Sequence, residues 1–196
     1  NDGSSNKAGQ DVDSDTSGGV DADEVVNFDN PNDAMVLDEI ASGTTVGMRD
    51  TDLSTAFNFA DTTGDADAVD LVLDEVAAEN SNEQKTIVQI DGIETFNIQT
   101  QNESSSLLLT GDDAETLNIT GDQDLTIDAA DEDGLNFTTV DASAFAANLD
   151  IKLRDGVDVT FTGGAGDDTV NMIGGLDSDD TVDGGEGADT LSITGG

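Results

Sequence analysis

The chain has 196 residues and carries 45 Asp and Glu against 5 Lys and Arg, which gives a formal net charge of −40 at pH 7. Because nucleic acids and anionic membrane surfaces both need a basic face on their protein partner, this charge argues against either as a partner. The chain contains no Cys and no His, which excludes a disulfide framework, a thiolate metal site and a Ser–His or Cys–His catalytic pair.

Residues 1–24 consist mostly of Asp, Ser, Gly and Asn. Because so few of their side chains are apolar, they cannot on their own offset the entropy of ordering. Two interpretations stay open for this segment: an acidic low-complexity linker, or worn repeats of the acidic type found later. The chain starts at Asn1 without Met and its last residues begin another repeat, so we expect a piece of a longer protein.

From residue 25 onward, short apolar pairs alternate with acidic turns, and each pair indicates a half-buried strand. Examples are Val46 with Met48 and Phe57 with Phe59. Two stretches, 33–41 and 70–79, also fit helices, because Ala, Leu and Glu favour that conformation. For the second stretch we favour a strand over 69–73 that is followed by a loop.

A repeated pattern runs from residue 91 to residue 164 with a period of 21 or 22 residues. Its copies are DGIETFNI, DDAETLNI, DGLNFTTV and DGVDVTF, which begin at residues 91, 112, 133 and 155. Further apolar segments lie between them, at 107–109, 125–127 and 149–153. One such unit cannot bury its own apolar face but stacked units can, so the pattern predicts an all-β parallel β-helix or β-solenoid with coils of about 20 residues. A β-sandwich is the alternative, and the constant offset of the repeated words favours the parallel stack.

Two stretches near the end of the chain, 163–171 and 184–192, match the nonapeptide G-G-x-G-x-D-x-U-x, where U is a large apolar residue. A degenerate copy lies between them at 174–182, with one extra residue and with Asp177 in place of the third glycine. This nonapeptide resembles the calcium-binding repeat of RTX proteins. Its glycines allow tight turns and its aspartate adds a hard oxygen ligand of the kind that Ca²⁺ prefers. We expect RTX β-roll turns that continue the solenoid with tighter coils, although an acidic Gly–Asp turn without metal stays an alternative.

The RTX resemblance implies two carboxylates and four loop carbonyls as calcium ligands, namely Asp168, Asp189, Gly164, Gly166, Gly185 and Gly187. In the degenerate copy, Asp179 and Asp180 compete for the middle site. Five more aspartates occupy acidic turns of the 21-residue repeats, where ligation and simple solvation are equally good interpretations: Asp112, Asp113, Asp122, Asp131 and Asp133. Ca²⁺ is the only cofactor that we expect.

The words IETFNI, AETLNI, LTIDAAD and TTVDASAF, followed by GGAGDDTV, resemble the strand repeats of bacterial S-layer proteins and other large secreted surface proteins. The resemblance covers residues 86–196 well and 25–85 loosely. It implies type I secretion, folding on calcium outside the cell at the bacterial surface, and assembly into a lattice or filament. A cell-surface polysaccharide is a further partner to consider.

Catalysis is not expected. Sugar-cleaving sites need only two carboxylates, but they usually present aromatic platforms, and the only aromatic residue here is Phe, mostly at positions that should point inward. Lys152 and Arg154 share the strand face opposite Leu149, Ile151 and Leu153, and we interpret them as neutralising nearby acids. No apolar run approaches the roughly 18 residues of a transmembrane helix.

The sequence thus predicts three parts: residues 1–24 as linker or worn repeats, 25–162 as solenoid strand repeats, and 163–196 as an RTX β-roll. The expected function is that of a calcium-stabilised structural module of a secreted, S-layer-like surface protein that self-assembles. The alternatives are the spacer or stalk of an RTX adhesin and the RTX segment of a secreted polysaccharide-acting enzyme.

Overall fold

The structure, a computed structural model, describes residues 35–64, 66–78, 86–111, 113–129, 137–154, 158–173 and 176–194. These residues form fifteen β-strands and no helix, hence none that is long and apolar enough to cross a membrane. The predicted all-β class is confirmed. The linker or worn-repeat interpretation of residues 1–24 lies outside the described residues.

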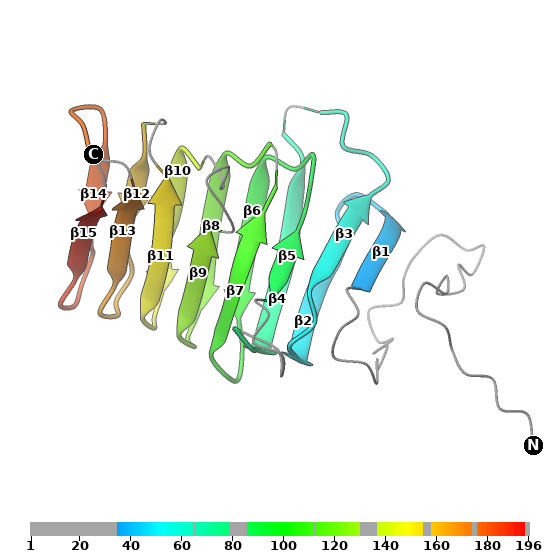
Figure 1. Cartoon of the computed structure of the whole chain (residues 1–196), viewed down its shortest axis with the longest axis horizontal. Coiled ribbons are helices and arrows are strands. Elements are labelled where there is room, and N and C mark those ends of the chain that lie inside the picture. Colours follow the sequence, from blue (N-terminus) through cyan, green and yellow to red (C-terminus); the bar gives the residue numbers. More distant parts are fainter. Residues whose placement is uncertain are drawn as a thin grey trace, which may run out of the picture.

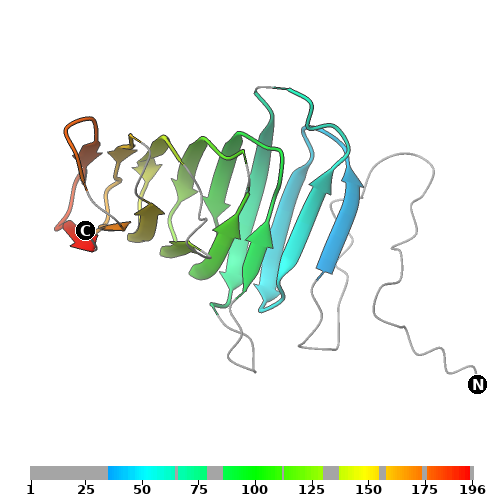
Figure 2. The same cartoon turned by 45° about the horizontal axis from the view of Figure 1, so that its top comes forward.

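The strands alternate along the chain between two parallel sheets (Figure 1). Sheet A contains, in order, β1 (Met35–Ile40), β3 (Thr55–Phe59), β5 (Ile87–Gln89), β7 (Ser105–Thr110), β9 (Leu125–Ala129), β11 (Leu149–Arg154), β13 (Thr169–Ile173) and β15 (Thr190–Thr194). Sheet B contains β2 (Thr45–Thr51), β4 (Ala68–Val76), β6 (Thr95–Thr100), β8 (Thr116–Gly121), β10 (Thr139–Phe145), β12 (Thr160–Thr162) and β14 (Thr181–Asp183). One strand from each sheet makes one coil, and the coils follow one another along a single axis (Figure 2).

Equivalent residues of the repeated sequence segments are paired in register between adjacent strands. In sheet B, Thr95 pairs with Thr116 and Thr160 pairs with Thr181, each 21 residues further on. The apolar segments between the words form β7, β9 and β11 of sheet A. Because every described strand pair is parallel, the solenoid is confirmed and the antiparallel sandwich is excluded.

The nonapeptide region continues this stack with the same number of residues per coil. Thr169 in β13 pairs with Thr190 in β15, again 21 residues apart, so the expectation of tighter coils is wrong. The two full nonapeptides lie in consecutive coils of sheet A, and the degenerate copy contributes β14 to sheet B. The degenerate copy, with its extra residue, therefore fills the opposite half of a full-length coil.

The core is one apolar layer between the two sheets, because side chains alternate inward and outward along each strand. Phe57, Phe96, Phe145 and Phe161 are at most 1% exposed, which confirms the predicted inward position of these rings. Each such ring stabilises the fold by about 1.5–3 kcal/mol through removal of its surface from water. The flanking aliphatic residues of successive coils extend this layer along the whole stack.

The two stretches that also fitted helices are strands. Met35–Ile40 forms β1, and β4 runs to Val76 instead of ending near residue 73 as predicted. Glu75 has φ of 57°, and Val76 beyond it still pairs with Thr51, so pairing with β2 continues past the left-handed residue.

Candidate cation sites in the C-terminal coils

The aspartates of the nonapeptides occupy equivalent positions at the start of three strands. Asp168, Asp180 and Asp189 each come directly before the Thr that begins β13, β14 and β15. This position is a corner of the solenoid, where the chain leaves a glycine-containing loop and enters a strand. The predictions for Asp112, Asp131 and Asp133 lie outside the described residues, and Asp113 is exposed in the turn before β8.

Asp168 is buried and bonded to the backbone. Asp168 is 1% exposed. The amide of Leu149, in the preceding coil, donates to Oδ1 across 2.9 Å. The amide of Gly164, in the same loop, donates to Oδ2 across 2.9 Å. Both carboxylate oxygens therefore complete the backbone hydrogen bonding of the corner.

Asp180 repeats this arrangement on the opposite sheet. Its Oδ1 accepts from the amide of Val159 and its Oδ2 from the amide of Asp177, each across 2.8 Å. The amide of Val159, and then that of Asp177, hold the pKa of Asp180 below its ordinary value, because both bonds favour the charged carboxylate. Of the two residues that competed for the middle repeat, Asp180 thus takes the motif position.

Asp189 is exposed, and its Oδ1 accepts from the amide of Asp168 across 3.0 Å. The adjacent residues bond in the opposite direction. Here the amide of Ala188, in the later coil, donates to Oδ1 of Asp167, in the earlier coil, across 2.8 Å. Each of these two adjacent coils therefore supplies a carboxylate that accepts from a backbone amide of the other coil.

The glycines predicted as carbonyl ligands form the touching surfaces of two loops. The carbonyl of Gly164 accepts from the amide of Glu186 across 2.9 Å. A Cβ placed on Gly185 or Gly187 would meet the carbonyl oxygens of Gly164 and Gly166 at 2.3 and 2.1 Å. Glycine is required here because the backbones of adjacent coils approach too closely for any side chain.

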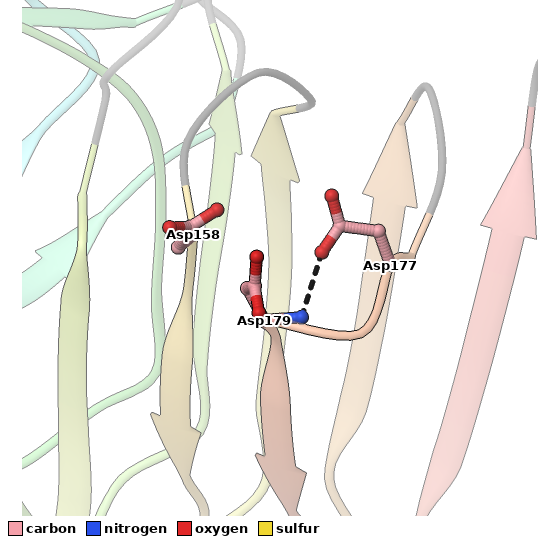
Figure 3. A group of neighbouring side chains, drawn as sticks. All are labelled: Asp158, Asp177 and Asp179. Atoms are coloured by element: carbon pink, nitrogen blue, oxygen red, sulfur yellow. Dashed lines mark hydrogen bonds between the residues drawn. The ribbon is translucent and has the colours of Figure 1, made fainter.

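Asp179 belongs to a group of three exposed carboxylates with Asp158 and Asp177 (Figure 3). One oxygen of each lies within 4.8 Å of the other two. Asp158 precedes β12 and Asp179 precedes β14, and the pairing of these strands sets the two side by side. Asp177 comes from the loop before β14, where its Oδ1 accepts from the amide of Asp179 across 2.8 Å.

This acidic group, Asp158, Asp177 and Asp179, offers only hard oxygen donors, which suit Ca²⁺ completed by water molecules. Three carboxylates this close repel one another, and a divalent cation would relieve that repulsion. The sequence interpretation included Asp179 but not its two neighbours. Asp158 was detectable, because it stands 21 residues before Asp179 in a chain with a repeat of that length.

Two cations in the described coils neutralise acids. Lys152 Nζ lies 2.8 Å from Asp128 Oδ1, which confirms the interpretation of Lys152. Arg49 Nε lies 2.8 Å from Asp74 Oδ2. The side chain of Arg154 lies outside the described residues.

Comparisons with protein-family models, with curated proteins and with solved structures found no match to this chain.

Proposed function

We propose that this chain is a structural module of a secreted, S-layer-like surface protein, stabilised by calcium and built to continue or associate end to end. The observation that carries the proposal is the unbroken parallel stack from β1 and β2 to β14 and β15. Such a stack is a quasi-one-dimensional element in which each coil contacts only its neighbours, and it suits a scaffold or spacer. Phe57, Phe96, Phe145 and Phe161 are buried in its core, so these four rings do not offer an aromatic platform to a sugar substrate.

The association surface in this proposal is the apolar stripe at β15. Leu191 and Ile193 are register partners of Val170 and Met172, which are 3% and 1% exposed. Leu191 and Ile193 continue that core stripe, yet they are 44% and 52% exposed. A further coil, from the same chain or from a neighbouring one, would cover them and extend the parallel sheet.

Calcium acts in this proposal on the acidic surface. The group of Asp158, Asp177 and Asp179 is the described site that best suits an ion, because its carboxylates are exposed and close together. Bound Ca²⁺ would hold two coils together at that corner and would lower the repulsion between acidic copies. The millimolar calcium outside cells matches the affinity of exposed sites of this kind.

A calcium titration tests the proposal. We expect calorimetry to detect binding, thermal unfolding to shift upward, and light scattering with negative-stain imaging to show ordered polymers as calcium reaches the millimolar range. The triple variant Asp158→Asn, Asp177→Asn and Asp179→Asn should weaken binding by about tenfold or more, because it removes three ligand charges.

The matched control removes the same charge from scattered exposed sites outside the candidate ligands, with Glu103→Gln, Asp50→Asn and Asp150→Asn. Equal calcium binding by both triple variants would mean that bulk charge, and not the acidic group, attracts the ion. The variant Ile193→Glu should keep the fold and prevent end-to-end association. A folded, calcium-loaded chain that stays monomeric at high concentration would contradict the association and favour the adhesin spacer.

A further inference from the structure

The corner where β9, β11, β13 and β15 begin carries two rows of register partners. The pairs Leu125 with Leu149, Asp150 with Thr169, and Thr169 with Thr190 fix these rows. We call one the outer row, formed by Asp124, Asn148, Asp167 and Ala188. We call the other the motif row, formed by Leu149, Asp168 and Asp189.

In the outer row, the first three side chains each accept a hydrogen bond from the amide of the partner in the next coil. The amide of Asn148 donates to Asp124 Oδ1 across 3.0 Å. The amide of Asp167 donates to Asn148 Oδ1 across 2.8 Å, and that of Ala188 donates to Asp167 Oδ1 across 2.8 Å. An amide oxygen at Asn148 thus does what a carboxylate oxygen does at its two neighbours, so the row needs an acceptor and not a charge.

In the motif row, the bonds run the opposite way. Asp168 Oδ1 accepts from Leu149 in the preceding coil across 2.9 Å, and Asp189 Oδ1 accepts from Asp168 across 3.0 Å. The two rows together tie each coil to the next in both directions. A slip of one coil by one residue would break bonds in both rows.

The motif row does not fit an ion held between the two glycine loops. Asp168 is 1% exposed, and each of its oxygens already accepts a backbone hydrogen bond. The loops touch, because a Cβ on Gly187 would lie 2.1 Å from the carbonyl oxygen of Gly166. Calcium needs six to eight oxygens at about 2.3–2.6 Å, so its insertion there would part the loops and take Asp168 away from its amides.

We propose that Asp168 and Asp189 serve as backbone acceptors that lock the register of the C-terminal coils without a metal ion. In this role the aspartate of each nonapeptide accepts hydrogen bonds from backbone amides instead of coordinating an ion. The proposal does not depend on the acidic group of Asp158, Asp177 and Asp179, which belongs to a different corner. Calcium at that group would add stability to coils that are already closed.

Asp189 offers the sharpest test, because its acceptor role and its charge can be separated. Asp189→Asn keeps an oxygen for the amide of Asp168 and removes the charge, whereas Asp189→Ala removes both. Amide hydrogen exchange in the presence of a calcium chelator measures directly whether these amides are hydrogen-bonded without the ion. We expect the amides of Leu149 and Asp168 to be protected in the unmodified chain, the Asp168 amide to stay protected in Asp189→Asn, and that amide to exchange at least about tenfold faster in Asp189→Ala.

The proposal is overturned if the Leu149 and Asp168 amides of the unmodified chain become protected only after calcium is added. It is also overturned if Asp189→Asn and Asp189→Ala exchange equally fast. A calcium affinity that falls in Asp189→Asn would make Asp189 a ligand and contradict the proposal as well. The proposed function fails by a different result, namely unchanged calcium binding in the Asp158, Asp177 and Asp179 triple variant.

Discussion

Asn118 Nδ2 donates to Asn97 Oδ1 across 2.8 Å on the outer face of sheet B. Asn97 Nδ2 in turn donates to Asp70 Oδ1 across 2.9 Å. The three residues are register partners in β8, β6 and β4. In a chain with 45 acidic residues, these neutral amides let polar side chains stack closely along the sheet without repulsion.

The first prediction is that Asn97→Asp destabilises the solenoid by about 1–2 kcal/mol at low salt. The change removes the amide that donates to Asp70 and places two carboxylates opposite each other. Because exposed charges are screened, the loss should shrink as salt is added. Urea unfolding at low and at high ionic strength measures both effects.

Gln99→Glu is the matched control for this prediction. Gln99 also points outward from β6, and its Oε1 accepts from Gln101 Nε2 across 3.1 Å. A glutamate there keeps that acceptor and adds the same charge to the same strand. If Gln99→Glu costs as much as Asn97→Asp, bulk charge explains the loss and the row of amides does not.

The second prediction concerns Asp74, whose carboxylate joins three successive coils. It is 6% exposed and its Oδ2 lies 2.8 Å from Arg49 Nε and accepts from Asn102 Nδ2 across 2.8 Å. Asp74→Ala should cost about 2 kcal/mol of unfolding free energy, because it removes the shared acceptor. Arg49→Ala should cost less than about 1 kcal/mol, because the Arg49 side chain is 69% exposed. Urea unfolding of both variants decides the matter, and equal losses would contradict a central role for Asp74.

The third prediction is that Glu75→Gly stabilises the protein. Glu75 has φ of 57°, and the residues at the same bend in the adjacent coils, Asp50 and Asn102, have φ of 46° and 55°. Left-handed backbone costs a residue with a Cβ about 1–2 kcal/mol, and the greater freedom of glycine in the unfolded chain returns part of it, so the net gain should be about 0.5–1 kcal/mol.

Glu75→Ala is the control, because alanine keeps the Cβ and hence the strain. Thermal unfolding should place the midpoint of Glu75→Gly above that of Glu75→Ala. The reverse order would show that the bend tolerates a Cβ without cost.

The sequence predicted the solenoid well because its repeat is carried by the residues that alternate in and out of the core. Thr95 and Thr116 begin the same word 21 residues apart, and they are register partners. The length of β4 was not predictable from such words. It depends on Glu75 adopting a conformation that its residue type disfavours, and stacking on neighbouring coils imposes that conformation.

The candidate site was predictable in part. The nonapeptide pattern singled out Asp168 and Asp189, but it could not say whether their carboxylates hold a metal ion or accept from amide groups. An aspartate that follows a glycine loop can serve either role. The choice depends on how closely the loops of adjacent coils approach, and that distance follows from the stack as a whole.

The last prediction concerns Asp141 and pH. Asp141 lies on the outer face of β10, and the amide of Ser143 donates to its Oδ1 across 2.9 Å. The hydroxyl of Ser143, and then its amide, hold the pKa of Asp141 below its ordinary value. Because its register partners in the adjacent strands are Asn118 and Thr162, no charged partner in those strands competes with this effect.

A folded-state pKa below the unfolded value means that the charged form of Asp141 stabilises the fold. This contribution is fully present above the unfolded pKa of about 3.9 and is lost as the pH falls through the lowered folded value. Ser143→Ala should raise the pKa of Asp141 toward its ordinary value and remove this part of the acid sensitivity. Carboxyl ¹³C NMR titration of the unmodified chain and of Ser143→Ala measures the shift. An Asp141 that titrates at the same pH in both proteins would show that Ser143 does not stabilise its carboxylate.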